Sequence, residues 1–134
     1  MRHLLVYLLL ACSLPLAAQH VSTDDSSQNA GKVEWSPRMI EVDSVVAFGV
    51  PVTREFIVKN WSKEDLVLTK VRTGCSCTMV DYTQTPIPPN KGGIVRVTYD
   101  AQKEGDFYRV ITVTTNFDPA QPVALILKGK VAKM

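Results

Sequence analysis

The stretch GDFYRVITVTTN, residues 105–116, alternates apolar and polar side chains with a period of two. Phe107, Ile111 and Val113 share one parity, and Arg109 is the polar residue that interrupts it. Such alternation among β-branched and aromatic residues is typical of a half-buried strand, because successive side chains of a strand point to opposite faces. The stretch therefore predicts a strand over residues 107–115.

The same period recurs along the chain on both sides of this segment. We expect strands at residues 33–36, 39–46, 52–59, 65–72, 78–82, 92–100, 107–115 and 122–131. Segments rich in Pro, Gly, Asn and Asp separate these strands and predict turns. No stretch of ten residues after Lys32 has the period of an amphipathic helix. Short strands at this spacing predict an all-β fold, a single immunoglobulin-like antiparallel β-sandwich of seven to eight strands over residues 33–134.

Length and composition fit one soluble domain. The chain has 134 residues, 46% of them hydrophobic and 21% charged, with a formal net charge of +2. No run of Lys and Arg forms a basic patch, which argues against a nucleic-acid-binding protein. The sequence has no Gly-rich phosphate loop and no Ser-His-Asp order that survives export, so we expect no enzymatic activity and no cofactor.

The first 18 residues have the character of a secretory signal peptide. A short positive start precedes an apolar run, and Leu16-Ala17-Ala18 offers small residues for cleavage before Gln19. The run is too short to span a bilayer, so we expect no transmembrane segment in the mature chain. Residues 19–32 are small and polar, which predicts a flexible leader ahead of the sandwich.

Cys12 suggests an alternative to soluble export, namely a lipid anchor. Leu9-Leu10-Ala11-Cys12 resembles a bacterial lipobox, in which the cysteine is lipidated after cleavage, although the preceding apolar run is short. We therefore expect a periplasmic or secreted protein, with a lipid anchor on Cys12 as the alternative.

Four motifs stand in order along the chain. They are TGCSCT at 73–78, PIPPNKGG at 86–93, GDFYRVITVTTN at 105–116 and LILKGKV at 125–131. The series resembles the bacterial domain-of-unknown-function family 1573, whose pattern contains a Cys-Gly-Cys-Thr turn, a Pro-Ile-x-Pro-Gly loop, a Gly-x-Phe strand ending in Thr-x-Asn, and a final Gly-x-Val. The resemblance covers residues 33–131. Ser76 and Asn90 stand where that family usually has glycine.

The resemblance implies an immunoglobulin-like sandwich of the Hydin-like superfamily. It also implies export in Gram-negative bacteria, very often of the Bacteroidota, and it implies no enzymatic activity. Because the biochemistry of the family is unassigned, function cannot be transferred together with the fold.

Cys75 and Cys77 are the clearest chemical signal in the mature chain. In a straight strand, residues i and i+2 have Cα atoms nearly 7 Å apart, so a disulfide between them requires a bend. Three interpretations stay open: a structural turn, which we favour, a redox or thiol-exchange pair, and a two-thiolate site for a soft ion such as Cu(I). Arg72 is the nearest positive charge in the sequence.

Two further residues are candidate surface sites. Trp61 lies in the polar turn Asn60-Trp61-Ser62-Lys63, where an exposed aromatic ring predicts a contact surface. Ser44, within Asp43-Ser44-Val45, matches the short O-glycosylation pattern of Bacteroidota.

Together these features predict an exported, non-catalytic interaction or structural module of the bacterial cell envelope. We expect it to bind another envelope protein, because a small sandwich exposes strand edges that can pair with a partner's strand. The alternative is a redox or copper-handling protein that uses Cys75 and Cys77.

Overall fold

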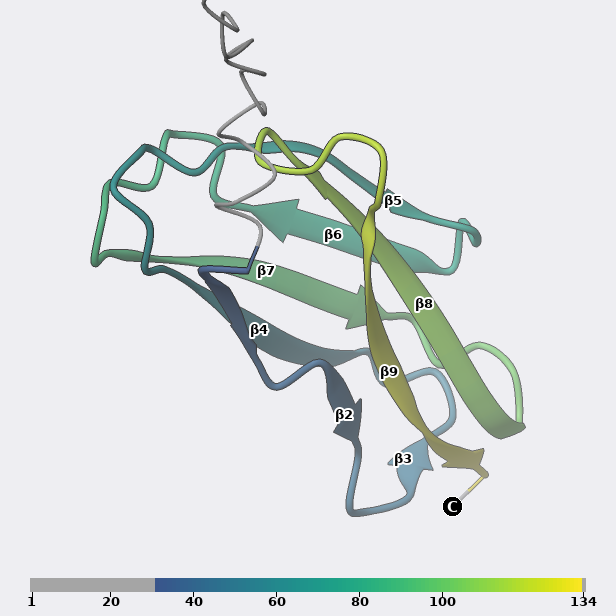
Figure 1. Ribbon diagram of the computed structural model, residues 1–134. Helices are drawn as coiled ribbons and strands as arrows, with labels where there is room; N and C mark the ends of the chain where they lie inside the picture. The colour runs from purple at the N-terminus through teal and green to yellow at the C-terminus, as the bar shows by residue number, and fades with distance from the viewer. Residues whose placement is uncertain (1–30, 134) are drawn as a thin grey trace, which may run out of the picture.

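The computed structural model describes residues 31–133, which form a sandwich of two β-sheets (Figure 1). In chain order the strands are β1 (Val33–Ser36), β2 (Met39–Glu41), β3 (Val46–Ala47), β4 (Val52–Asn60), β5 (Leu68–Thr73), β6 (Thr78–Tyr82), β7 (Gly92–Tyr99), β8 (Gly105–Thr115) and β9 (Val123–Ala132). This part of the chain contains no helix, and hence none that could cross a membrane. The predicted all-β, immunoglobulin-like sandwich is confirmed.

One sheet has the order β1-β4-β7-β6, and all of its pairs are antiparallel. The other has the order β2-β9-β8-β5, with β3 also paired to β9. The chain crosses from the first sheet to the second between Ser36 and Met39. As a result β2 and β3 run parallel to β9, so the prediction of a purely antiparallel sandwich was wrong for this edge.

The predicted strand 39–46 is divided in two, which brings the strands among residues 31–133 to nine instead of seven to eight. Val42 and Val46 are both buried, whereas Ser44, which has the same parity, is exposed between them. The chain leaves β9 at the exposed bend between them, after a last hydrogen bond of 2.9 Å from Val42 N to Lys128 O. The alternation of apolar and polar residues indicates which face of the sheet each side chain lies on. It does not indicate whether the backbone hydrogen bonds of the strand are continuous.

The strand predicted from residue 65 begins at Leu68. Leu66 instead forms an isolated bridge with Ile87, and the side chain of Asn116 accepts the N–H of Val67 at 2.8 Å. A register shift between Leu68 and Lys70 then places a bulge at the start of β5. The strands predicted at 33–36 and 78–82 agree with β1 and β6 at both ends.

The core lies between the two sheets and is built from the inward parity of each strand. Phe107 stacks on Tyr99 with ring centroids 4.5 Å apart. Gly129 allows this packing, because a Cβ there would lie 2.8 Å from Cζ of Phe107. Other fully buried side chains are Phe56, Val58, Leu66, Val95, Val97, Ile111, Val113, Leu125 and Leu127.

Asn60 is a fully buried polar residue at the end of β4. Its Nδ2 donates to the carbonyl oxygens of Glu64 at 2.7 Å and Ile87 at 2.8 Å. Its Oδ1 accepts from the backbone N of Ser62 at 2.9 Å and from the Ser62 hydroxyl at 2.6 Å. One side chain thus ties the turn after β4 to the loop before β7.

The predicted signal peptide 1–18 and nearly all of the predicted leader 19–32 lie outside the described residues. Both stay predictions, as does the boundary of the domain at residue 33.

Candidate functional site

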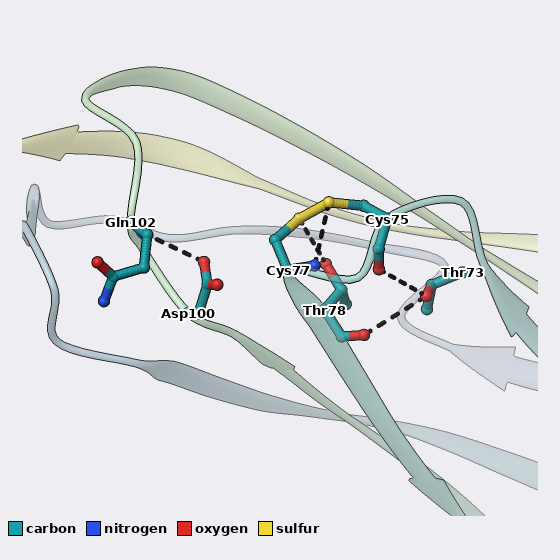
Figure 2. The surroundings of a disulfide bond; sticks show 6 residues. All are labelled: Thr73, Cys75, Cys77, Thr78, Asp100 and Gln102. Atoms are coloured by element: carbon teal, nitrogen blue, oxygen red, sulfur yellow. Dashed lines mark hydrogen bonds between the residues drawn. A yellow bond between two sulfur atoms is a disulfide. The ribbon is translucent and has the colours of Figure 1, made fainter.

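The turn between β5 and β6 carries the cysteine pair. A disulfide joins Cys75 to Cys77, whose Cα atoms are 5.2 Å apart (Figure 2). This separation is well below that of a straight strand, so the chain bends between them. Hydrogen bonds hold the bend: the Thr73 hydroxyl donates to Cys75 O at 3.1 Å, and Thr78 N donates to the same oxygen at 3.3 Å.

The two sulfur atoms have different surroundings. The backbone N–H of Cys77 donates to Sγ of Cys75 at 3.2 Å, whereas Sγ of Cys77 lies 3.6 Å from the hydroxyl oxygen of Thr78. Both cysteines are half-buried. Cys77 packs against the hydrophobic core, and Cys75 lines a surface pocket. Cys75 is therefore the residue of the pair that a molecule in the pocket would meet.

The pocket beside Cys75 has a volume of about 210 Å³. It is lined by residues of the turn and of β8: Thr73, Gly74, Cys75, Thr78, Tyr108, Arg109 and Val110. Arg109 is the only charged residue in this lining. Arg72, the nearest positive charge in the sequence, is exposed on β5 and does not line the pocket.

Arg109 is held by packing. Its guanidinium carbon lies 5.0 Å from the centroid of the Tyr99 ring, which is a cation–π contact. Its Nε is buried and has no hydrogen-bond partner within residues 31–133. No carboxylate forms an ion pair with Arg109 in the same part of the chain. Arg109 thus lines the pocket and carries a positive charge that forms no ion pair among residues 31–133.

The sequence analysis did not identify Arg109 as a residue of this pocket, although the sequence contains a signal for it. Arg109 breaks the apolar parity of its strand, and that irregularity marks a side chain with an unusual environment. The alternation could not predict the strand pairing that brings Arg109 near the turn, because Thr73 pairs with Ile111, which lies 38 positions later in the chain.

Trp61 lies at the surface directly after β4, with 48% of its side chain exposed. Its Nε1 donates to a carboxylate oxygen of Glu34 at 2.7 Å, and Nζ of Lys59 lies 5.1 Å from the ring centroid. With Ser36 and Ile57 these residues line a shallow hollow of about 330 Å³. Trp61 is therefore available for contact, and its role as a contact residue stays a prediction.

Ser44 is exposed in the bend between β2 and β3. It lines an open hollow of about 450 Å³ together with Asp43 and Val45. Ser44 is therefore accessible to solvent. Its O-glycosylation stays a prediction. Cys12, the candidate for a lipid anchor, lies outside the described residues.

Nowhere in residues 31–133 do three or more His, Cys, Asp or Glu side chains gather in a way that could hold a metal ion. The two-thiolate Cu(I) interpretation of Cys75 and Cys77 involves fewer ligands than such a cluster and stays a prediction.

Comparison with solved structures gives the same fold at low sequence identity. A protein of unknown function from Porphyromonas gingivalis W83 matches with a TM-score of 0.62 and 17% identity, over 73% of this chain and 46% of that one. The ASH/PapD-like domain 7 of human CEP192 matches with a TM-score of 0.64 and 12% identity, over 77% and 87%. The VesB protease of Vibrio cholerae matches with a TM-score of 0.60 and 11% identity, over 78% and 33%.

At these identities the likeness concerns the fold alone, which is PapD-like and immunoglobulin-like. The chain spans less than half the length of the P. gingivalis and VesB chains that it matches. No curated protein matches it in sequence. The family model described as "Protein of unknown function (DUF1573)" matches residues 33–131, so the chain belongs to the DUF1573 family.

Proposed function

We propose that this protein is an exported, non-catalytic interaction module of the bacterial cell envelope. Its partner is another envelope protein that supplies an extended segment, and this segment pairs with the open edge of β6. The observation that carries the proposal is the regular edge of that strand, which no other strand of residues 31–133 pairs.

The two sheets end on the same side of the sandwich in β5 and β6, one in each sheet (Figure 1). The edge of β5 is protected: it contains the register shift between Leu68 and Lys70, and Lys70 and Arg72 are exposed on it. Bulges and positive charges are the usual means by which proteins prevent strand addition. β6 pairs with β7 in unbroken register from Thr78 to Tyr82, and it has no such bulge.

The backbone groups on the open side of β6 can be assigned from its ends. Cys77 O accepts from Asp100 N, and Thr83 N donates to Ile94 O, so the odd-numbered residues face β7. In an antiparallel pair the intervening residues point their N–H and C=O groups to the opposite side. Val80 and Tyr82 therefore present their backbone groups on the side where no strand of residues 31–133 pairs.

The side chains at this edge also suit a protein partner. Met79 is 72% exposed, the highest value among the large hydrophobic residues of the described chain. Strand addition obtains affinity from main-chain hydrogen bonds and specificity from such neighbouring side chains. The secretory character of residues 1–18 and the polar residues 19–32 supports a location outside the cytoplasm.

The test is a pair of substitutions at one edge position. Val80→Pro removes the outward N–H without removing a hydrogen bond to β7, whereas Val80→Thr keeps that N–H and nearly the same shape. We expect a partner captured by the tagged protein from cross-linked envelope extracts to be lost with Val80→Pro and kept with Val80→Thr. Equal recovery with both folded variants would overturn the proposal.

A further inference from the structure

Arg109 lines the same pocket as Cys75, and no carboxylate among residues 31–133 forms an ion pair with it. Arg109 is half-buried, and its Nε is buried with no hydrogen-bond partner among residues 31–133, so this polar atom needs an explanation. The Tyr99 ring accounts for its orientation, but it does not neutralise the charge. Arg109 and Cys75 line the same pocket, and this shared lining links the arginine to the disulfide.

We propose that Cys75 and Cys77 form a thiol–disulfide exchange site, and that Arg109 directs it toward thiols that carry a nearby carboxylate. This inference does not depend on partner binding at β6. It concerns the pocket formed by the turn and β8, whose lining contains no residue of the β6 edge beyond Thr78.

The exchange has two balanced steps. The thiolate of the incoming thiol attacks Sγ of Cys75, the Cys75–Cys77 bond breaks, and Sγ of Cys77 leaves as a thiolate that takes a proton from water. The thiolate of a second thiol molecule then attacks the sulfur of the first in the mixed disulfide. The products are the external disulfide and the reduced pair, so two thiols are oxidised and one protein disulfide is reduced.

Cys75 is the sulfur that is attacked because it lines the pocket, while Cys77 packs against the core. In the reduced protein the same residue is the better nucleophile. In the disulfide form the Cys77 N–H donates to Sγ of Cys75 at 3.2 Å, and the same donor is available to that sulfur when it attacks a disulfide. Cys77 then acts as the resolving cysteine that closes the disulfide again.

The pocket also defines the class of thiol. Its volume of about 210 Å³ suits one small side chain or a small molecule. A carboxylate on the incoming thiol would pair with the free guanidinium, whereas an ammonium group would be repelled by it. We expect cysteines next to acidic residues, or small acidic thiols, to react faster than neutral or cationic thiols of the same size.

A trapping experiment on the full chain tests the order of the sulfurs. In Cys77→Ser only Cys75 remains at the turn, and in Cys75→Ser only Cys77 remains. Each variant is treated with 3,3′-dithiodipropionate, and the peptide that contains the turn is followed by mass spectrometry, which separates it from Cys12. We expect a mixed disulfide to form at Cys75 at least about tenfold faster than at Cys77. Equal rates, or a faster Cys77, would overturn the assignment.

A second experiment tests Arg109 on the oxidised protein. Reduction rates are compared for 3-mercaptopropionate, 2-mercaptoethanol and cysteamine, which are similar in size and differ in charge. In Arg109→Gln the rate ratio of the anionic to the cationic thiol should fall by about fivefold or more. Arg72→Gln is the matched control, since it removes a positive charge outside the pocket, and its ratio should not change.

Circular dichroism of each variant verifies that it is folded. A disulfide that resists millimolar thiols in the folded protein would overturn the proposal, because the bridge would then be structural only. An unchanged ratio in Arg109→Gln would overturn the role of the arginine.

Discussion

Arg109 lies against Tyr99, with its guanidinium carbon 5.0 Å from the ring centroid, at a position of β8 whose neighbours in parity are core residues. The contact allows a charged side chain at an inward-facing position of the strand, because the face of an aromatic ring attracts a cation. The buried Nε has no hydrogen-bond partner among residues 31–133, so the contact with Tyr99 does not satisfy every polar atom of the side chain.

Replacement of this arginine should therefore stabilise the domain while it removes thiol selectivity. Met has a similar length and no polar group to desolvate, so Arg109→Met should raise the free energy of unfolding by about 1 kcal/mol. Urea denaturation measures the change, with Arg72→Met as the control on an exposed site. A loss of stability in Arg109→Met would instead mean that the contact with Tyr99 outweighs the cost of burial.

Asn60 should be one of the most sensitive polar positions. Asn60→Ala removes four hydrogen bonds and leaves the carbonyls of Glu64 and Ile87 without this donor, so we expect a loss of about 3 kcal/mol or more in urea denaturation. Asn116 is the control: its side chain also bridges a turn, from Val67 N to Asp65 O, but it is exposed. Asn116→Ala should cost only about 1 kcal/mol, and an equal cost for the two would contradict the importance of burial.

Gly129 should not tolerate a methyl group. In Gly129→Ala the new Cβ would meet Cζ of Phe107 at 2.8 Å and Cε1 at 2.9 Å, so the ring must move within a packed core. We expect a loss of about 1–3 kcal/mol. Gly74→Ala provides the comparison, because a Cβ there meets no atom within 4 Å, and its thermal midpoint should stay near that of the parent protein. The result would also explain the glycine of the Gly-x-Val motif by close approach.

Reduction of the disulfide should leave the domain folded. The bridge joins residues only two apart in sequence, so it restricts the unfolded chain little. The expected loss is about 1.5 kcal/mol or less, as measured by urea denaturation with and without reductant. Unfolding of the domain on reduction at room temperature would contradict this expectation, and it would also leave no folded state in which exchange could operate.

Export should produce a mature chain that begins at Gln19. N-terminal sequencing of the protein from a periplasmic fraction checks this expectation. A chain that begins at a lipidated Cys12 would favour the lipid anchor. An intact Met1 in the cytosol would contradict both soluble export and the lipid anchor.

Much of the fold could be predicted because a strand that is buried on one face has alternating apolar and polar residues in its sequence. Alternating side chains located β1 and β6 at their observed ends and β4, β7, β8 and β9 within two residues. Ile111 and Val113, expected on one face from their shared parity, are both fully buried. These features depend on the direction of each side chain, and a strand fixes that direction locally.

The remaining features depend on partners that are distant in sequence. The parallel pairing of β2 with β9 and the meeting of Arg109 with Cys75 both arise from how the sheets are ordered. The late start of β5 has a similar cause, because the side chain of Asn116 takes the N–H of Val67 that a ladder would have used. A local pattern contains no information about such partners.

The parallel pairing of β2 and β3 with β9 gives the domain a direction of mechanical resistance. A force that pulls the chain ahead of β2 away from the chain after β9 draws these strands in opposite senses along their common axis. The backbone bonds between them, from Val42 N–Lys128 O to Phe48 N–Ala132 O, then share the load together in shear and do not open one after another. A module tethered on its N-terminal side would keep its shape under tension through this short ladder.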